Sequence, residues 1–398
     1  MRKLIEGSMA VAELVKLCRP NVIAAYPITP QTHIVEDLSQ FVADGDLKAE
    51  FLNVESEFGA ASVVLGASAT GARAYSTTTS QGLLLMGEVL HNIAGMRLPV
   101  VITCANRAIS APINIWNDHS DAMTVRDAAW IMLFAEDNQE AADMHPQAFK
   151  IGENPNICLP VLINMDGFIL THAFEPVDIP DQEEVDDFLP SYKPAEYLTV
   201  KNPRTFGMLA EPQWYAETRY KLYETQEDAK SVIERVAAEF KNKFGRYSGG
   251  LIDTYRLDDA ERAFVAMGSL IGTLKDVVDD LRAKGEKVGI LKIRSFRPFP
   301  KEKIREVCSG VKELIVLEKA FSFGLGGILQ EELRAAFYKQ KHQPIISGFV
   351  LGLGGRDIPP STLANIYAGS KGREISNAFI DLRPEISYNP FAKEPVKG

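Results

Sequence analysis

Short apolar segments rich in β-branched residues alternate with segments of helical periodicity from residue 8 to about residue 170. A strand that is apolar throughout is buried on both faces, which is typical of parallel strands with helices on either side. The pattern therefore predicts an open, doubly wound parallel sheet. The expected strands are 21–26, 49–54, 72–79, 99–105, 130–135 and 160–165, and the expected helices are 34–42, 58–69, 82–94 and 139–151.

A second alternation of the same kind begins near residue 259. Because 398 residues exceed the roughly 100–200 residues of one core, two domains are expected. The predicted fold class is α/β, with doubly wound domains over 1–170 and 259–398 joined by a long connector over 171–258. One amphipathic stretch, 216–244, predicts a single exposed helix in that connector. The second domain's expected strands are 263–267, 287–293, 313–318 and 345–351, and its expected helices are 270–284, 302–308 and 328–337.

Composition excludes several classes of function. The net charge is -10 and Lys and Arg are not clustered, so neither a nucleic-acid partner nor an anionic membrane surface is expected. The longest apolar run, 98–105, is shorter than the roughly 20 residues that span a bilayer. Acidic residues near the N-terminus argue against a secretory signal, which favours the cytoplasm. The four cysteines form no C-x-x-C motif, so no iron–sulfur cluster or zinc site is expected in this chain.

A threonine between two prolines follows the first expected strand, in the segment Tyr26-Pro27-Ile28-Thr29-Pro30. The prolines stiffen the loop, and loops at the carboxyl ends of parallel strands line the ligand crevice. The hydroxyl of Thr29 is therefore a candidate to hydrogen-bond a small polar ligand. A simple strand-ending turn explains the same residues.

A carboxylate stands where the second expected strand passes into a helix. Glu57 lies at the helix start, where the positive end of the helix dipole favours an acidic residue, so capping alone explains one glutamate. The small residues that follow, Gly59, Ala60 and Ala61, leave room for a cofactor ring or another backbone. Glu57 is therefore also a candidate proton partner.

An arginine follows the fully apolar strand over 99–105. The guanidinium of Arg107 matches a substrate carboxylate with two parallel hydrogen bonds. The alternative is a structural salt bridge to Asp118 or Asp121. These two carboxylates and His119 also suggest a metal site, but Asp-His-x-Asp without a helical i, i+4 pair is a weak ligand pattern.

Together these segments resemble the α subunit of the multi-subunit pyruvate:ferredoxin oxidoreductases, which belong to the 2-oxoacid:ferredoxin oxidoreductase family. The likeness runs in order through nearly the whole chain. In the first half it is carried by YPITP (26–30), ESEFGAA (55–61), TTTSQGLLLM (77–86) and NRAISAPINIWNDHSD (106–121). In the second half it is carried by MGSLIGT (267–273), RPFP (297–300), LEKAFSFGLGG (317–327) and GLGGRDI (352–358).

The resemblance implies a first domain of the thiamine pyrimidine-binding type and a second of the transketolase C-terminal type. It implies thiamine diphosphate at the interface with a β subunit, whose G-D-G…N motif holds the diphosphate and Mg²⁺. It further implies [4Fe-4S] clusters on the β subunit and on a ferredoxin-like δ subunit, a γ subunit, CoA as a substrate and ferredoxin as the acceptor. This chain has no G-D-G motif, as is typical of an α subunit, and no metal ligands of its own are expected.

The resemblance also assigns roles to individual residues. Glu57 matches the glutamate that hydrogen-bonds the aminopyrimidine ring, and Thr29 and Pro30 line the same cofactor site. Thr29 and Arg107 match the residues that grip the carbonyl and carboxylate of the 2-oxoacid. Thr29 argues against the oxalate-specific branch, which carries arginine there, and pyruvate is the expected substrate. Departures from the family's pattern at 91–92 and 128–129 leave an aromatic 2-oxoacid, such as phenylglyoxylate, as an alternative.

The predicted reaction is oxidative decarboxylation of a 2-oxoacid to acyl-CoA and CO₂, by a chain that is active only with its partner subunits. Two other functions stay open: a non-oxidative thiamine enzyme and a non-catalytic scaffold subunit. The joint presence of Thr29, Glu57 and Arg107 favours catalysis, because a scaffold needs none of the three.

Overall fold

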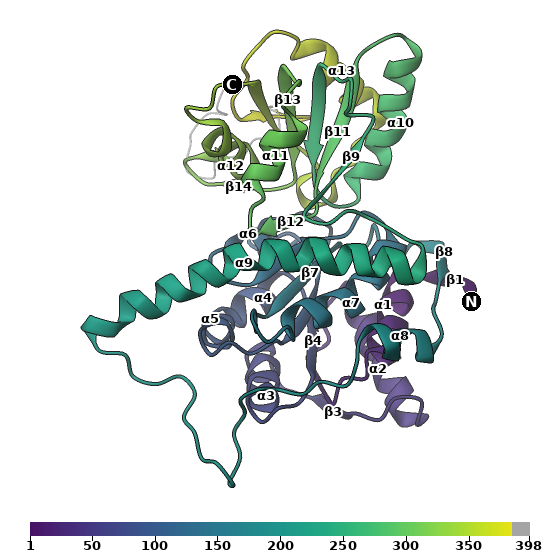
Figure 1. Ribbon diagram of the computed structural model, residues 1–398. Helices are drawn as coiled ribbons and strands as arrows, with labels where there is room; N and C mark the ends of the chain where they lie inside the picture. The colour runs from purple at the N-terminus through teal and green to yellow at the C-terminus, as the bar shows by residue number, and fades with distance from the viewer. Residues whose placement is uncertain (384–398) are drawn as a thin grey trace, which may run out of the picture.

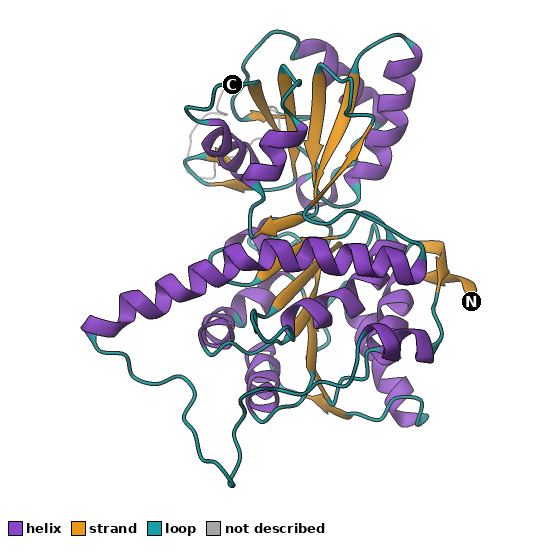
Figure 2. Ribbon diagram, viewed as in Figure 1, coloured by secondary structure: helices purple, strands orange, loops and turns teal. Residues whose placement is uncertain are grey.

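Two sheets flanked by helices form the two halves of the chain in the computed structural model, which describes residues 1–383 (Figures 1 and 2). The first sheet has the strand order β12-β6-β7-β5-β4-β2-β3, and its pairings are parallel apart from that of β12 with β6. The predicted α/β fold class is confirmed. The strands are β2 (Val22–Ala25), β3 (Glu50–Asn53), β4 (Ala74–Thr78), β5 (Val101–Asn106), β6 (Ile131–Phe134), β7 (Val161–Asp166) and β12 (Ser295–Arg297).

Helices cover both faces of this sheet because its strands are apolar on both. One face packs against α1, α2 and α7, and the other packs against α3 and α5. The helix predicted over 82–94 is divided into α4 and α5, and α1 and α6 were not predicted. The helices are α1 (Gly7–Leu17), α2 (Thr32–Ala43), α3 (Glu57–Ala69), α4 (Ser80–Leu85), α5 (Gly87–Gly95), α6 (Ser120–Thr124) and α7 (Asn138–Gly152).

The second sheet has the strand order β17-β16-β13-β10-β11-β9, with β9 antiparallel to its neighbour. Helices α10 and α13 pack on one face, and α11 and α12 pack on the other. All four strands and three helices predicted for this half are present. The elements are β9 (Ile252–Tyr255), β10 (Arg262–Ala266), α10 (Leu270–Ala283), β11 (Val288–Ile293), α11 (Lys301–Val307), β13 (Glu313–Glu318), β14 (Phe321–Ser322), β15 (Gly326–Gly327), α12 (Ile328–Phe337), β16 (Ile345–Val350), η1 (Leu353–Gly355), α13 (Pro360–Gly369) and β17 (Ala378–Phe379).

The segment 171–258 holds more structure than the predicted connector with one exposed helix. Its first strand, β8 (Phe174–Asp178), pairs with β1 (Arg2–Glu6), and a short helix, α8, follows at Gln182–Phe188. The long helix α9 (Pro212–Phe244) buries a stripe of side chains from Leu222 to Phe240, so the expectation of an exposed helix is wrong for that part. The N-terminal end of α9 and the loop before it extend away from both domains (Figure 1).

A strand from the second half of the chain completes the first sheet. β12 follows β11 directly, and its Ser295 and Arg297 pair with Leu133 and Met132 of β6. Phe296 in the same strand is fully buried, and its ring packs edge-on against that of Phe134 at a centroid distance of 6.4 Å. The two domains therefore share one sheet edge, a crossing that the alternating pattern did not predict.

Buried charges join the domains beside this shared strand. Glu140 on α7 accepts hydrogen bonds from Lys292 Nζ at 2.6 Å and from Arg294 Nε at 2.9 Å. The remaining nitrogens of Arg294 donate to the carbonyl of Gly250 at 3.0 Å and to Gln147 Oε1 at 3.1 Å. Burial lowers the pKa of Lys292, but the carboxylates around it outweigh that effect and raise it. Lys292 therefore stays charged in the interior.

No helix within residues 1–383 combines the length with the apolar composition that crossing a bilayer requires. The four cysteines are free thiols.

Replacing Glu140 with glutamine tests this junction. A neutral side chain leaves the charge of Arg294 without a carboxylate and leaves Lys292 with Glu136 alone, at 3.1 Å, and breaking such a buried pair costs about 3 kcal/mol of unfolding free energy. Urea unfolding followed by circular dichroism measures the change. The matched control is Glu239→Gln, because Glu239 pairs with Lys150 at 2.7 Å on the surface, where such pairs contribute about 0–1 kcal/mol. Equal losses in the two variants would contradict a special role for the buried cluster.

Candidate functional site

The three candidate residues lie at one edge of the first sheet. Thr29 follows β2, Glu57 begins the helix after β3, and Arg107 follows β5. Since β3, β2, β4 and β5 are neighbours and run parallel, their carboxyl ends meet at the same edge. Pro30 is buried and lies close to Gly167 in the loop after β7, where an added Cβ would come within 2.6 Å of the proline ring.

Arg107 contacts Thr29 through the backbone. The guanidinium is 6% exposed, and it donates from Nη1 to the carbonyl of Thr29 at 2.8 Å and from Nε to the carbonyl of Asn114 at 3.0 Å. Nη2 has no partner within residues 1–383. The alternative of a salt bridge to Asp118 or Asp121 is wrong, because neither carboxylate contacts the guanidinium. One edge of Arg107 is therefore free for a ligand, and its other contacts fix its position.

Glu57 is a largely buried residue whose carboxylate has no protein partner. The residue is 6% exposed, and no hydrogen bond or ion pair reaches its oxygens from any of residues 1–383. Its oxygens are not among the fully enclosed polar atoms, so the carboxylate reaches the surface of the site. The side chain that caps α3 is Ser56, whose hydroxyl accepts from the backbone N–H of Gly59 at 3.2 Å, while Glu57 lies in the first turn, where the helix dipole favours a carboxylate. The Glu57 oxygens therefore make no contact that a ligand would have to displace.

Two further unpaired polar groups lie in the segment 78–82, whose Gly82 borders Glu57, and no role for them was predicted. The hydroxyl of Thr78 and the amide nitrogen of Gln81 are buried without partners within the described chain. A Cβ added to Gly82 would lie 2.6 Å from Glu57 Oε1 and 2.6 Å from Thr78 Oγ1, so Gly82 gives these groups their space. The sequence signal for these groups was the T-T-T-S-Q-G segment at 77–82, which is part of the family resemblance but had been assigned no role.

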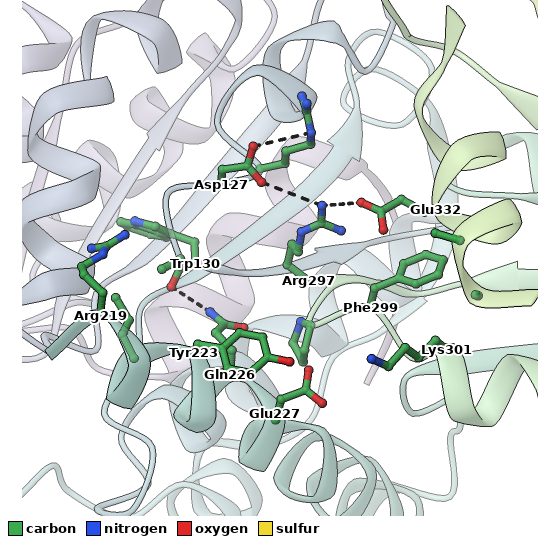
Figure 3. Close-up of a pocket in the computed structure, with 16 residues that line it drawn as sticks. Asp127, Trp130, Arg219, Tyr223, Gln226, Glu227, Arg297, Phe299, Lys301 and Glu332 are labelled. Atoms are coloured by element: carbon green, nitrogen blue, oxygen red, sulfur yellow. Dashed lines mark hydrogen bonds and ion pairs between the residues drawn. The ribbon is translucent and has the colours of Figure 1, made fainter. Parts of the chain in front are cut away.

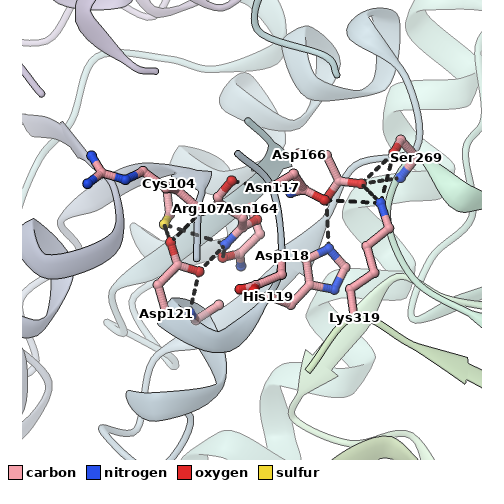
Figure 4. A network of polar contacts seen from close by, with 12 residues as sticks. Cys104, Arg107, Asn117, Asp118, His119, Asp121, Asn164, Asp166, Ser269 and Lys319 are labelled. Carbon is pink, nitrogen blue, oxygen red and sulfur yellow. Dashed lines mark hydrogen bonds and ion pairs between the residues drawn. The ribbon is translucent and has the colours of Figure 1, made fainter. Parts of the chain in front are cut away.

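Asp121 connects the loop after β4, which carries Ser80, to the loop after β5, which carries Arg107 (Figure 4). One oxygen accepts from the backbone N–H groups of Ser80 and Arg107, both at 3.0 Å, and the other accepts from Asn106 Nδ2 at 3.0 Å. Burial raises the pKa of Asp121, and these donors oppose the shift. Ser80 has a φ of 48°, a left-handed conformation that is strained for serine. Asp121 thus fixes the ends of β4 and β5 relative to each other.

A second carboxylate, Asp166, connects this edge to the second domain (Figure 4). It accepts from His119 Nε2 at 2.7 Å, from Lys319 Nζ at 2.8 Å and from the backbone N–H of Ser269 at 3.0 Å. Burial raises the pKa of Asp166, but Lys319 and His119 outweigh it and hold that pKa well below its usual range. Within residues 1–383, Asp118, His119 and Asp121 do not bring their ligand atoms together as a metal-binding group, so the suggestion of a metal there is not supported.

The glycine-rich loop of the second domain, residues 352–355, contacts the segment that follows Arg107. Gly354 donates from its backbone N–H to Asp118 Oδ2 at 3.2 Å and accepts from Asn114 Nδ2 at 3.1 Å. A Cβ added to Gly355 would come within 2.4 Å of Trp116. The two sequence motifs at 106–121 and 352–358 are therefore in contact, and the glycines are required by that close approach.

A cavity of about 500 Å³ lies away from this edge, between the first domain, α9 and the segment 297–301 (Figure 3). Arg297 is paired there with Glu332 and Asp127. Thr29, Glu57 and Arg107 do not line it. The polar edge of the first sheet, rather than this cavity, is the candidate site.

Comparison with known proteins shows the family. A family model described as pyruvate flavodoxin/ferredoxin oxidoreductase, thiamine diphosphate-binding, matches residues 13–238. A model of the pyruvate:ferredoxin oxidoreductase core domain II matches residues 260–363. Pyruvate synthase subunit PorA of Methanosarcina barkeri is 53% identical over 390 residues, which are 96% of this chain and 97% of that protein. The chain belongs to the pyruvate flavodoxin/ferredoxin oxidoreductase family.

Other relatives extend the comparison. Pyruvate synthase subunit PorA of Thermotoga maritima is 46% identical, over 92% of this chain and 93% of its own length. Ketoisovalerate oxidoreductase subunit VorA of Pyrococcus horikoshii is 45% identical, over 90% of each chain. A solved 2-oxoglutarate:ferredoxin oxidoreductase from Magnetococcus marinus has a TM-score of 0.73 at 19% identity, and the match covers 92% of this chain and 65% of that one. This structural likeness shows the shared fold.

Replacing Gly82 with alanine tests the packing around Glu57. The added methyl group overlaps two oxygens, and overpacking of this kind costs about 1–3 kcal/mol. Gly66→Ala on α3 is the control, since a Cβ there meets no atom within 4 Å and alanine favours a helix by about 1 kcal/mol. Urea unfolding should therefore show opposite signs for the two variants. A stabilised Gly82→Ala would mean that the space beside Glu57 is larger than the structure describes.

Proposed function

We propose that this chain is the α subunit of a 2-oxoacid:ferredoxin oxidoreductase that converts pyruvate, CoA and oxidised ferredoxin to acetyl-CoA, CO₂ and reduced ferredoxin in the cytoplasm. The observation that carries this proposal is the carboxylate of Glu57, a largely buried residue whose oxygens have no partner within residues 1–383, at the same sheet edge as the fixed guanidinium of Arg107. A scaffold subunit has no use for either group. The relatives named pyruvate synthase subunit PorA, at 45–53% identity, support pyruvate as the substrate.

The groups around Glu57 fit the aminopyrimidine of thiamine diphosphate. The Glu57 carboxylate accepts a hydrogen bond, the Gln81 amide donates one, and the Thr78 hydroxyl does either. When bound, thiamine diphosphate would supply the nucleophile and the electron sink for decarboxylation. Glu57 would hold and exchange a proton at its carboxylate oxygen.

Arg107 would bind the substrate carboxylate with its free Nη2 edge. The guanidinium is already fixed by two backbone carbonyls, so little conformational freedom is lost when the substrate binds. The Thr29 side chain is exposed beside it, and its hydroxyl would hydrogen-bond the substrate carbonyl oxygen. The two residues together would hold a 2-oxoacid by its carboxylate and its carbonyl oxygen.

Partner subunits would supply what this chain lacks. A β subunit would hold the diphosphate and Mg²⁺, and [4Fe-4S] clusters on it and on a ferredoxin-like δ subunit would carry the electrons, with a γ subunit completing the complex. The absence of a C-x-x-C motif and of G-D-G from the sequence supports this division.

Purifying the complex and comparing 2-oxoacids in CoA-dependent viologen reduction tests the substrate. Pyruvate should give the highest kcat/KM, with 2-ketoisovalerate and phenylglyoxylate as the competing substrates. 2-Ketoisovalerate is included because a VorA protein is 45% identical to this chain. Preference for either competitor would overturn pyruvate while keeping the reaction class. Turnover that releases an aldehyde without reducing viologen would overturn the reaction class.

Arg107→Ala should raise the KM for pyruvate by roughly 30- to 1,000-fold, because a lost contact between a buried charge and a carboxylate costs about 2–4 kcal/mol. Gel filtration should show an unchanged complex. Arg126→Ala is the control, since that arginine lines the separate cavity and should leave KM unaltered. An unchanged KM in Arg107→Ala would leave this arginine as a loop anchor only.

Glu57→Gln should lower turnover by roughly 10²-fold or more, because glutamine keeps the shape but cannot exchange a proton. Exchange of the thiazolium C2 proton, measured by NMR in the assembled complex, should slow in parallel. Glu55→Gln is the control, because Glu55 is exposed two residues away. Equal exchange rates in the Glu57→Gln complex and the unmodified complex would falsify the assignment of Glu57 as proton partner.

A further inference from the structure

Three side chains that can bind a metal converge from segments far apart in the sequence. Glu6 ends β1, His33 lies in the first turn of α2, and His172 lies in the loop between β7 and β8. One ligand atom from each of these residues lies within 4.8 Å of the others, and within residues 1–383 they are the one such group found. His33 Nδ1 is 2.8 Å from Glu6 Oε1, and His172 Nδ1 is 4.0 Å from the same oxygen.

The backbone around the cluster is well fixed. β1 pairs with β8, which places Glu6 opposite Phe174, two residues after His172. Thr171, next to His172, is anchored through its backbone carbonyl. This carbonyl accepts from the backbone N–H of Ser8 at 3.1 Å and from the Ser8 hydroxyl at 2.9 Å. The Thr171 hydroxyl lies 2.7 Å from His172 Nδ1 and orients the ring, and an ion that binds this nitrogen would displace that contact.

The local charge is negative. Glu6 contacts His33 directly at 2.8 Å, and Glu36 and Asp37 on α2 lie near the same imidazole. A divalent cation would neutralise the excess negative charge.

We propose that Glu6, His33 and His172 bind one divalent transition-metal ion of the zinc class. Two imidazoles and a carboxylate are a donor set that zinc prefers, whereas Mg²⁺ and Ca²⁺ prefer oxygen ligands. Ligand atoms of a tetrahedral zinc site lie roughly 3.3 Å apart, given metal–ligand distances of about 2.0–2.1 Å. The observed spacings, 2.8 Å and 4.0 Å from Glu6 Oε1 and at most 4.8 Å within the group, bracket that value, and the ion would replace the proton shared by His33 and Glu6.

The coordination sphere is open to solvent. The side chains of His33, His172 and Glu6 are 45%, 33% and 18% exposed, so an ion can enter and a fourth position can hold water. Such an ion would connect β1, α2 and the loop after β7. Phe168 in that loop lies 4.6 Å from His172 and 6.3 Å from Trp116 between ring centroids, and His33 follows Pro30 by three residues. The site would therefore stabilise the segments that support the sheet edge.

Isothermal titration of the full chain with Zn²⁺ in metal-free buffer tests the proposal. One equivalent should bind, and His33→Asn and His172→Asn should each weaken binding at least 10-fold. His91→Asn is the matched control, because His91 is exposed on α5, outside the cluster, and it should bind as the unmodified chain does. A large excess of Mg²⁺ should not compete.

Thermal unfolding with and without Zn²⁺ provides a second readout, because each variant is compared with its own metal-free form. Zn²⁺ should raise the Tm of the unmodified chain and of His91→Asn, and should leave that of the two cluster variants unchanged. If either asparagine variant does not fold, Glu6→Gln replaces it and should lose the same shift. Absence of binding to the unmodified chain, or equal binding in all variants, would overturn the proposal.

Discussion

Compensation of buried charge between the two domains is the constraint on which the rest of this structure depends. Lys292 and Arg294 leave the second sheet and enter the first domain, where Glu140 accepts from both. On the far side of the junction Lys319 reaches Asp166 in the same way. A charge buried without its partner is strongly unfavourable, so each pair is satisfied at only one relative position of the domains. That position allows β12 to join the first sheet and the glycine loop to contact Trp116.

Some side chains of the candidate site are fixed by hydrogen bonds to the backbone, and others have no hydrogen-bond partner within residues 1–383. Asp121 saturates its oxygens with N–H donors from the loops after β4 and β5, and Arg107 donates to two carbonyls. Within residues 1–383 the Glu57 carboxylate and the Thr78 hydroxyl have no such partners, and the Thr78 hydroxyl is enclosed as well. In the proposed function, these are the groups that a ligand of matching chemistry would pair. This contrast distinguishes the edge from the solvent-exposed cavity beside α9, where charges already pair with each other.

The sequence by itself determined the fold class and the three residues at the sheet edge. Continuous apolar runs of strand length permit a doubly covered parallel sheet and little else, and residues that follow such strands necessarily meet at one edge. The helix α9 was placed correctly but its burial was not, because a narrow apolar stripe on a charged helix has the same periodicity whether it faces a core or a partner. The assignments of Glu57, Thr29 and Arg107 to particular roles came from the family resemblance rather than from the pattern.

Only the tertiary structure decided which polar groups are paired. Arg107, Asp118 and Asp121 are close in sequence, and a salt bridge among them was a reasonable alternative, yet Asp121 binds backbone N–H groups and Asp118 binds the second domain. Glu6, His33 and His172 are isolated in sequence, and they meet because β1 pairs with β8 beside the start of α2. The sequence determines which side chains can form hydrogen bonds or ion pairs. Which of these side chains pair with each other depends on long-range packing, since charged groups and donors from distant segments compete for the same buried partners.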